Sequence, residues 1–212
     1  MQIKVFSFNP LGVNTYLLWD ETGDGALIDV GCSSGQEFEA LFSFIERENI
    51  QIRHLLVTHP HFDHIYGAKG SMLHFGLPLE MHEKAVSLIG DAVEAARMWG
   101  FDFDDFEGVP SNKTFVEGDI IEFGTSQLEV LYTPGHCEGS VCFVSHSDKT
   151  VFSGDVLFRE SIGRTDFPTG DYDLLRDSIY NKLFTLEDCY TVRSGHGGRT
   201  TIGHERYNNP LL

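Results

Sequence analysis

Residues 58–64, THPHFDH, place three histidines and one aspartate within seven positions. Neutral imidazole nitrogen and carboxylate oxygen are ligands of zinc-class metals, and ligands close together in the chain form a site at little cost in loop entropy. In an extended turn His59 and His61 point the same way whereas Asp63 and His64 diverge, so two ions suit the pattern better than one. The simpler interpretation is that these are surface histidines and that Asp63 caps the next helix. We would favour it for a single histidine, but four candidate ligands after a buried strand favour metal binding.

Three further positions have the same chemistry. They are His136 in TPGHCEGS, Asp155 in FSGDVLF and His196 in RSGHGG. Each alone is an ordinary polar turn residue, but all three follow an expected strand, where ligands commonly bind in α/β folds. Their glycine neighbours allow the backbone to approach a crowded ion pair without a Cβ clash.

The elements that position these residues are indicated by hydrophobic periodicity. Short β-rich runs separated by Gly, Pro and Asn turns predict strands. The expected strands are residues 3–8, 14–19, 25–31, 52–59, 77–82, 119–123, 127–133, 140–145, 150–155 and 189–195. Apolar residues at helical spacing predict helices over residues 35–50, 65–76, 83–98 and 171–184.

Two of these helices carry specific expectations. In the helix over 83–98, the residues expected to face inward are Val86, Ile89, Val93 and Ala96. Asp171 suits the N-cap of the last helix. The stretch after the helix over 83–98, residues 99–113, contains aromatics and acids without a period, which predicts a long surface loop. Its acidic aromatic part, Trp99 to Phe106, is expected to serve as a lid or to pack as a satellite cluster.

Each half of the chain runs strands, helix, strand, with the polar motifs in the loops after strands. This order predicts an α/β fold of two mixed sheets packed together with helices outside. No linker, repeat or low-complexity segment divides the chain, so a single domain over residues 1–212 is expected.

Composition limits the function. A formal charge of −17, with no Lys/Arg run, disfavours nucleic acid and anionic membranes as partners. The first residues lack a continuous apolar stretch typical of a secretory signal, which favours a cytoplasmic protein with reduced thiols at its four scattered cysteines.

The segments THPHFDH, TPGHCEGS, FSGD and GHGG, in this order over nearly the whole chain, resemble the metallo-β-lactamase superfamily. SGDVLF, GRTDFPTGD and TTIGHERYNNP further resemble its glyoxalase II (hydroxyacylglutathione hydrolase) group, especially the short bacterial branch. The resemblance implies a four-layer αββα sandwich. It also implies two metal sites that share Asp155: metal 1 with His59, His61 and His136, and metal 2 with Asp63, His64 and His196.

The reaction implied is thioester hydrolysis by a binuclear metal centre. Two ions generate a bridging hydroxide near neutral pH and stabilise the oxyanion that forms when it attacks the carbonyl. A thiolate then leaves without a strong general acid, so Asp63 and Asp155 are ligands first and proton acceptors second. Zinc is the expected metal, and iron or manganese also suits His/Asp ligands.

The substrate is expected to be a small-molecule thioester. Arg159, Arg164 and Arg199 follow strand ends near the ligands, and Arg164 stands where glyoxalase II has a basic glutathione contact. An Arg164 paired with a surface aspartate is the alternative. The chain departs from glyoxalase II after His196, where two glycines replace an aromatic hydroxyl contact, and it reaches Leu212 without a helical substrate-binding domain. These departures predict modest turnover of glutathione thioesters.

The main alternative is a mononuclear iron persulfide dioxygenase, a relative that also contains GRTDF and binds one iron through two histidines and an aspartate. The full second ligand set favours two metals over this alternative. A β-lactamase is disfavoured by the absence of a visible export signal, and the remaining histidines, His54, His74, His82, His146 and His204, are assigned to structure.

Overall fold

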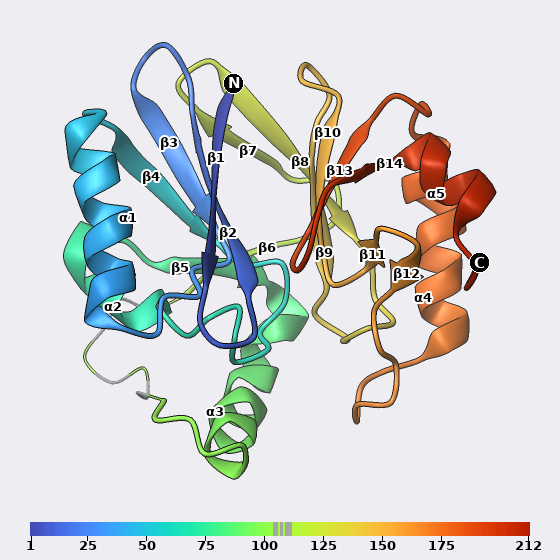
Figure 1. Cartoon of the computed structure of the whole chain (residues 1–212), viewed down its shortest axis with the longest axis horizontal. Helices are drawn as coiled ribbons and strands as arrows, with labels where there is room; N and C mark the ends of the chain where they lie inside the picture. The colour runs from blue at the N-terminus through green and yellow to red at the C-terminus, as the bar shows by residue number, and fades with distance from the viewer. Residues whose placement is uncertain (104–105, 107, 109–111) are drawn as a thin grey trace.

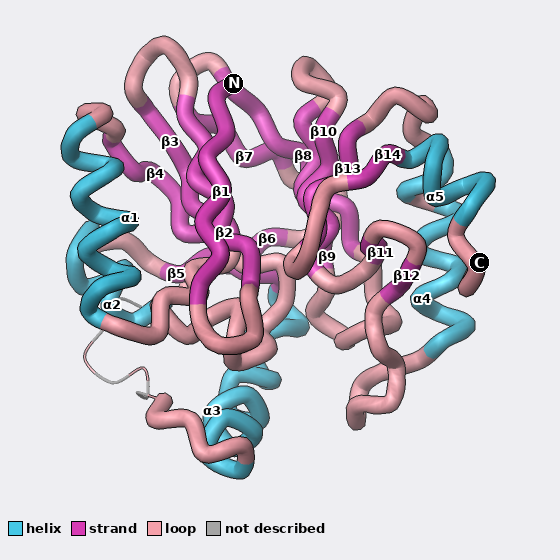
Figure 2. The backbone as a smooth tube through the Cα atoms, viewed as in Figure 1, coloured by secondary structure: helices cyan, strands magenta, loops and turns pink. Residues whose placement is uncertain are grey.

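The first half of the chain folds into a six-stranded mixed sheet (Figures 1 and 2). The structure is a computed structural model that describes residues 1–103, 106, 108 and 112–212. The first three strands form an antiparallel meander, and the next three continue the sheet in parallel. In sheet order they are β1 (Gln2–Phe8), β2 (Val13–Trp19), β3 (Asp24–Ile28), β4 (Gln51–Leu56), β5 (Leu79–His82) and β6 (Lys113–Phe115).

The second half forms another six-stranded mixed sheet, in which only the β10–β13 pair is parallel. In sheet order its strands are β14 (Thr200–Thr201), β13 (Thr191–Ser194), β10 (Thr150–Gly154), β9 (Val141–Ser145), β8 (Ser126–Tyr132) and β7 (Ile120–Phe123). A separate small hairpin, β11 (Leu157–Phe158) and β12 (Ser161–Ile162), follows β10.

Helices cover the outer faces of both sheets, as Figure 1 shows. Those on the first sheet are α1 (Gly35–Arg47) and α2 (Ala68–Phe75), and those on the second are α4 (Tyr172–Asn181) and α5 (Ile202–Asn208). α3 (Ile89–Met98) lies below the first sheet in Figure 1 and packs against the same cluster as α1 and α2 through Ala92 and Ala96. Two short 3₁₀ turns, η1 (Glu83–Leu88) and η2 (Leu183–Thr185), adjoin α3 and α4. The prediction of two mixed sheets with helices outside is confirmed.

Burial follows this layering. On β2, Leu17 points to the cluster under α1–α3, whereas its neighbour Leu18 points to the cluster between the sheets, because successive side chains of a strand face opposite ways. A third cluster joins Leu175 and Ile179 of α4 to the outer face of the second sheet. Both faces of the central strands are therefore buried, which explains their continuous apolar runs.

Several local predictions were wrong in extent; the strand expected over 25–31 ends at Ile28, and the helix expected over 35–50 ends at Arg47. The strand expected to run to His59 ends at Leu56. The helix expected over 83–98 begins as the 3₁₀ turn η1, whose three-residue period changes the phase of the inward face, so Ala85 is buried and Val86 is exposed. Lys113, assigned to a loop, begins β6. The predicted N-cap Asp171 is confirmed, since its side chain accepts a hydrogen bond from the Leu174 N–H.

The segment after α3 is aromatic. Phe103 is a buried member of the cluster under α1–α3, and Phe101 and Phe106 pack against it, so these aromatics join the main core and do not form a separate satellite cluster. Trp99 is exposed. Residues 104 and 105 of the predicted lid, and residues 107 and 109–111 of the predicted loop, lie outside the described residues.

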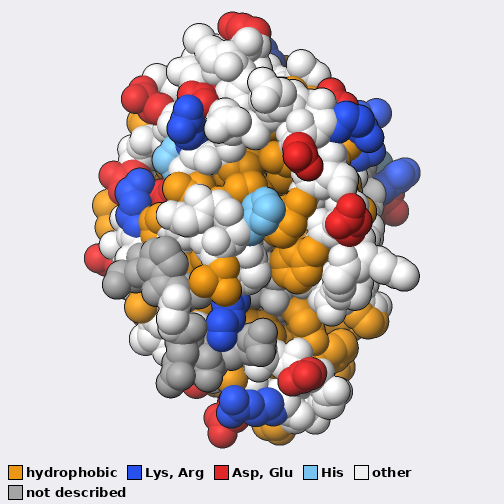
Figure 3. Space-filling view, turned by 90° about the vertical axis from the view of Figure 1, so that its left-hand side faces the viewer, with side chains coloured by type: hydrophobic (Ala, Val, Ile, Leu, Met, Phe, Trp, Pro, Cys, Tyr) orange, Lys and Arg blue, Asp and Glu red, His pale blue; other side chains and the backbone are white. Residues whose placement is uncertain are grey.

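Two surface properties bear on partners. No helix among the described residues is long and apolar enough to cross a membrane. On the face that carries α1 and α2, hydrophobic side chains surround a histidine, and positive and negative side chains are interspersed around them (Figure 3).

Candidate metal centre

The seven predicted ligands meet where loops from both sheets converge. The loop after β4 carries His59, His61, Asp63 and His64; His136 follows β8, Asp155 directly follows β10, and His196 follows β13. Each position lies just past the carboxyl end of its strand, as the sequence indicated. Asp63 does not cap the following helix, because α2 begins after Gly67 and has no side-chain cap.

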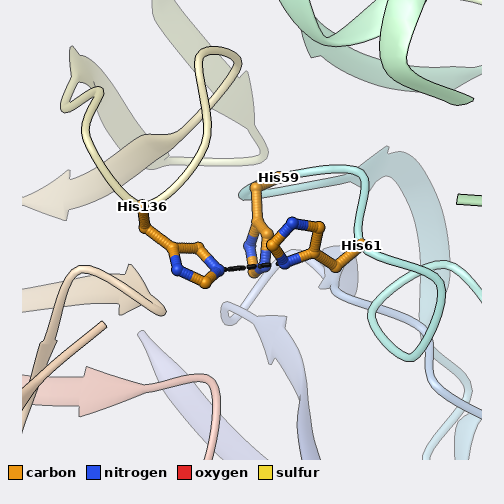
Figure 4. A group of neighbouring side chains, drawn as sticks. All are labelled: His59, His61 and His136. Carbon is orange, nitrogen blue, oxygen red and sulfur yellow. Dashed lines mark hydrogen bonds between the residues drawn. The ribbon is translucent and has the colours of Figure 1, made fainter. Parts of the chain in front are cut away.

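The first group is formed by three imidazoles, His59, His61 and His136 (Figure 4). His136 Nε2 lies 3.3 Å from His59 Nε2 and 2.9 Å from His61 Nδ1. Zinc–nitrogen bonds of about 2.0–2.1 Å in a tetrahedron place neighbouring ligand atoms about 3.3 Å apart. The three nitrogens are thus spaced as ligands of one ion would be.

The second group contains Asp63, His64 and His196. Asp63 Oδ2 lies 3.1 Å from His196 Nε2 and 3.7 Å from His64 Nε2. Asp155 lies between the groups, with Oδ1 3.4 Å from His64 Nε2 and Oδ2 3.8 Å from His136 Nε2. One carboxylate is therefore within reach of both groups.

Two atoms of this cluster, His64 Nε2 and Asp155 Oδ1, are buried and have no hydrogen-bond partner among the described residues. Buried polar atoms in folded proteins are almost always satisfied, and exceptions need an explanation. A divalent cation accounts for both atoms, because each presents a lone pair toward the same space. The donor set thus fits divalent metal ions.

In two of the histidines, the hydrogen bond made by the ring nitrogen that points away from the centre sets the tautomer. His136 Nδ1 donates to the Arg164 carbonyl oxygen at 2.7 Å, and His196 Nδ1 donates to the Leu11 carbonyl oxygen at 3.1 Å. A carbonyl only accepts, so each Nδ1 carries the proton and each Nε2 presents its lone pair inward. Such outer contacts orient ligands and raise their basicity.

Asp29 performs the same role for two more histidines. Its carboxylate accepts hydrogen bonds from His64 Nδ1 at 3.0 Å, from Thr58 N–H at 2.8 Å and from the Thr58 hydroxyl at 2.7 Å. Since the Thr58 proton is used there, Thr58 Oγ1 accepts from His59 Nδ1 at 3.0 Å. Sequence reasoning missed Asp29; the available signal was a charged residue directly after the apolar run GALI.

We expect Asp29→Asn to weaken metal binding about 10- to 100-fold, because an amide cannot accept all three hydrogen bonds and outer-shell changes have effects of this size. Asp20→Asn is a matched control. Asp20 is also buried and accepts hydrogen bonds from Thr22 and Thr125, but it lies in the β2–β3 turn away from the centre. Chelator competition on both variants measures the effect, and equal affinities would contradict the role given to Asp29.

The two groups differ in protonation. Burial lowers the pKa of His59 and His136, and it lowers the pKa of His61 to about 3. Burial alone would also lower the pKa of His64 and His196, but the nearby carboxylates outweigh it and raise both. Without metal, the histidines of the second group therefore hold their protons more tightly than those of the first group.

The loop between β1 and β2 and the start of β2 brace the centre, which the sequence did not indicate. Asn9 Nδ2 donates to the Asp63 carbonyl oxygen at 3.0 Å, and Asn14 Nδ2 donates to that of Gly197 at 3.0 Å. The Asn14 N–H also donates to the Gly195 carbonyl oxygen at 2.6 Å. Asn9 in the loop and Asn14 on β2 therefore fix the backbone on both sides of the second group.

A cavity of about 650 Å³ opens over the centre. Its walls are largely apolar and come from the end of η1, α3, the β11–β12 hairpin and the loop that follows the hairpin, including Leu88, Ala92, Met98, Phe158, Ile162 and Phe167. Arg164 also lines the cavity, and its guanidinium is paired with Asp166 at 2.8 and 2.9 Å over the Phe167 ring. Arg159 and Arg199 are exposed and are not among the lining residues.

The other candidate groups have structural contacts. His82 caps η1 and stacks on Tyr132, and His74 stacks on Phe42. His54 contacts Glu80, His146 contacts Glu129 and His204 contacts Glu160. Cys137 lines the cavity, but burial raises its thiol pKa, which favours the inert protonated form.

Two mixed sheets between helical layers, with a His/Asp cluster at the carboxyl ends of their strands, define a metal-dependent hydrolase. The chain belongs to the metallo-β-lactamase superfamily, whose family model matches residues 8–196. The hydroxyacylglutathione hydrolase GloC of Haemophilus influenzae is 38% identical over 214 residues, which cover 100% of this chain and 98% of GloC.

Solved structures agree with this assignment. The BLEG-1 B3 metallo-β-lactamase has a TM-score of 0.90 at 34% identity, covering 100% of this chain and 99% of its own. TTHA1623 in a di-iron-bound form has a TM-score of 0.87 at 34% identity, covering 99% and 100%. The predicted αββα metallo-β-lactamase fold and the resemblance to the glyoxalase II group are thus confirmed.

Proposed function

We propose that the protein is a binuclear metal-dependent thioesterase that cleaves S-2-hydroxyacylglutathione or a related small-molecule thioester. In this proposal His59, His61 and His136 hold one ion, and Asp63, His64 and His196 hold the other. Asp155 bridges them. The position of Asp155 between the two groups carries the binuclear part, and the full-length identity with GloC supports the thioester part.

Two bound divalent ions would supply a nucleophile at neutral pH and Lewis-acid stabilisation of the developing oxyanion. The chain's own residues contribute position and environment. Fixed tautomers aim four imidazoles inward, the apolar walls exclude water around the reacting carbonyl, and Asp63 and Asp155 offer carboxylates for proton transfer. A thiolate is a good leaving group and departs without being protonated by a strong general acid. The predicted site residues include no such acid, which is consistent with thioester hydrolysis.

The deciding experiment combines metal analysis with turnover of S-lactoylglutathione. We expect two metals per chain, most readily zinc, and measurable but modest hydrolysis that is lost on metal removal and regained on reloading. One iron per chain, with oxygen uptake in the presence of glutathione persulfide, would instead identify the mononuclear dioxygenase.

A second candidate is β-lactam hydrolysis, which the similarity to the BLEG-1 structure favours. With metal bound, the same seven ligands and cavity would suit attack on an amide carbonyl as well as on a thioester. Parallel assays with a chromogenic cephalosporin and with S-lactoylglutathione discriminate the two, and a kcat/KM higher for the β-lactam would overturn the thioesterase proposal.

Two negative charges on α3 are expected to lower kcat/KM for anionic substrates. Asp91 and Glu94 line the cavity, and the cationic Arg164 there is already paired. We expect Asp91→Asn combined with Glu94→Gln to raise kcat/KM for a glutathione thioester about two- to fivefold at low salt, since weakly screened surface charges act on this scale. A neutral N-acetylcysteamine thioester of the same acyl group is the control, and an equal change for both substrates would refute the electrostatic cause.

The protonation difference predicts a pH dependence of metal affinity. The first group has pKa values below neutrality and releases few protons on binding, whereas His64 and His196 have raised pKa values and must release theirs. Affinity for the second ion should therefore fall more steeply than affinity for the first as pH decreases from 8 to 6. Stepwise metal titrations over this range test the prediction, and parallel slopes would contradict it.

A further inference from the structure

The β11–β12 hairpin forms one wall of the cavity and is not hydrogen-bonded as a strand to either six-stranded sheet. Phe158, Ser161 and Ile162 line the cavity, and the two strands pair only with each other among the described residues. Two residues after β12, the Arg164 carbonyl oxygen accepts the hydrogen bond from His136 Nδ1. The hairpin thus shapes the substrate space and orients one predicted ligand.

The tip of the hairpin is held by a buried carboxylate from α5. Glu205 is fully buried, and its Oε2 accepts a hydrogen bond from the Glu160 N–H at 2.8 Å. Glu160 has φ +57°, a left-handed conformation that non-glycine residues rarely adopt. The carboxylate therefore holds a strained turn in place.

Asn209 completes the connection. Its Nδ2 donates to the Ser161 carbonyl oxygen at 3.1 Å and to Glu205 Oε2 at 2.9 Å. The Thr200 hydroxyl donates to the other Glu205 oxygen, and His204 Nε2 contacts the Glu160 carboxylate at 3.0 Å. A buried carboxylate is costly unless its oxygens are paired, and here both oxygens have partners.

Movement of the hairpin would reach the centre directly. At Gly163, directly after β12, an added Cβ would overlap the Asp155 carbonyl oxygen and lie 3.1 Å from His136 Nδ1. The chain therefore passes over a predicted bridging residue and a predicted ligand with no space between them. A shift of a few tenths of an ångström at the hairpin would be transmitted to both.

We propose that Glu205 and Asn209 are positioning residues for the metal centre and the cavity. Through the Glu160 N–H and the Ser161 carbonyl they fix the hairpin, and through the hairpin they fix the Arg164 carbonyl that orients His136. The segment TTIGHERYNN thus has a functional role at a distance from the chemistry. The effect on turnover rests on the proposed hydrolase function, whereas the effect on metal binding does not.

The test compares two adjacent asparagines. Asn209→Ala removes the hydrogen bonds from Asn209 to the Ser161 carbonyl oxygen and to Glu205 and leaves the bond from the Glu160 N–H to Glu205. Asn208→Ala removes only a hydrogen bond within α5, from Asn208 Nδ2 to the His204 carbonyl oxygen at 3.0 Å. We expect Asn209→Ala to lower affinity for the ion of the first group about tenfold or more, in line with other outer-shell changes. We also expect it to raise KM for a thioester more than it lowers kcat. Asn208→Ala should change both quantities less than twofold.

Stepwise chelator competition, cobalt(II) absorption spectra and thermal unfolding are measured on both variants and on Glu205→Gln. Altered cobalt spectra and lowered first-ion affinity in Asn209→Ala and Glu205→Gln, with folding retained, support the proposal. If both variants keep wild-type affinity, spectra and KM and lose only thermal stability, the role is structural and the proposal is overturned. Should wild-type protein hydrolyse no thioester, the proposed function fails while the metal measurements still decide this inference.

Discussion

Asp155→Ala is expected to abolish thioester turnover and to reduce the metal content from two ions toward one. Asp155 lies within 3.4–3.8 Å of His64, His136 and His196, and it is the only carboxylate among the seven predicted ligands that approaches both groups. Its removal leaves each ion one ligand short and removes a negative charge that offsets their mutual repulsion. Because paired ions contribute several kcal/mol, kcat/KM should fall at least about 10³-fold.

Metal analysis after gel filtration and steady-state assays measure both effects. Asp173→Ala is the control, since Asp173 is an exposed aspartate on the first turn of α4. It should retain two metals and wild-type turnover. Full activity in Asp155→Ala would refute the bridging role, and far-UV circular dichroism on both variants separates a lost site from a lost fold.

The fold was predictable where burial imposes a period. The strands from β1 to β5 and from β7 to β10 alternate or run apolar between turn residues, and α1 and α4 have one apolar face and a capping residue. β14 and α5 were missed because Thr200–Asn208 shows no period. Its stability comes from the buried Glu205 and from Ile202, which contacts the cluster under α4.

The candidate ligands were visible in the sequence because they cluster in turns of unusual composition. Their supports were not visible, because each acts across the fold. Asp29 is 35 positions from His64, and Asn9 is 54 positions from Asp63. Hydrogen bonds of this kind depend on which loops the sheets bring together, and no local pattern encodes them. The sequence could not rank the substrate contacts for the same reason. Three arginines follow strand ends, but the fold places only Arg164 of these three at the cavity.

The GHGG segment yields the sharpest test of the second group, because two of its glycines have different surroundings. A Cβ at Gly195 would overlap Asp155 Oδ1 and lie 2.6 Å from His64 Cε1, whereas a Cβ at Gly198 would meet nothing within 4 Å. We expect Gly195→Ala to displace both side chains and to lose the second ion. Misplacement of about 1 Å in a reacting site costs about 10²-fold, so kcat/KM should fall by at least that factor.

Gly198→Ala is the matched control in the same segment and should keep two metals and wild-type turnover. Metal content, the cobalt(II) spectrum and kcat/KM of both variants decide the matter. Equal behaviour of the two would mean that the backbone at Gly195 can retreat from Asp155. That retreat is opposed by two hydrogen bonds, from the Gly195 N–H to the Gly154 carbonyl oxygen at 2.8 Å and from the Asn14 N–H to the Gly195 carbonyl oxygen at 2.6 Å.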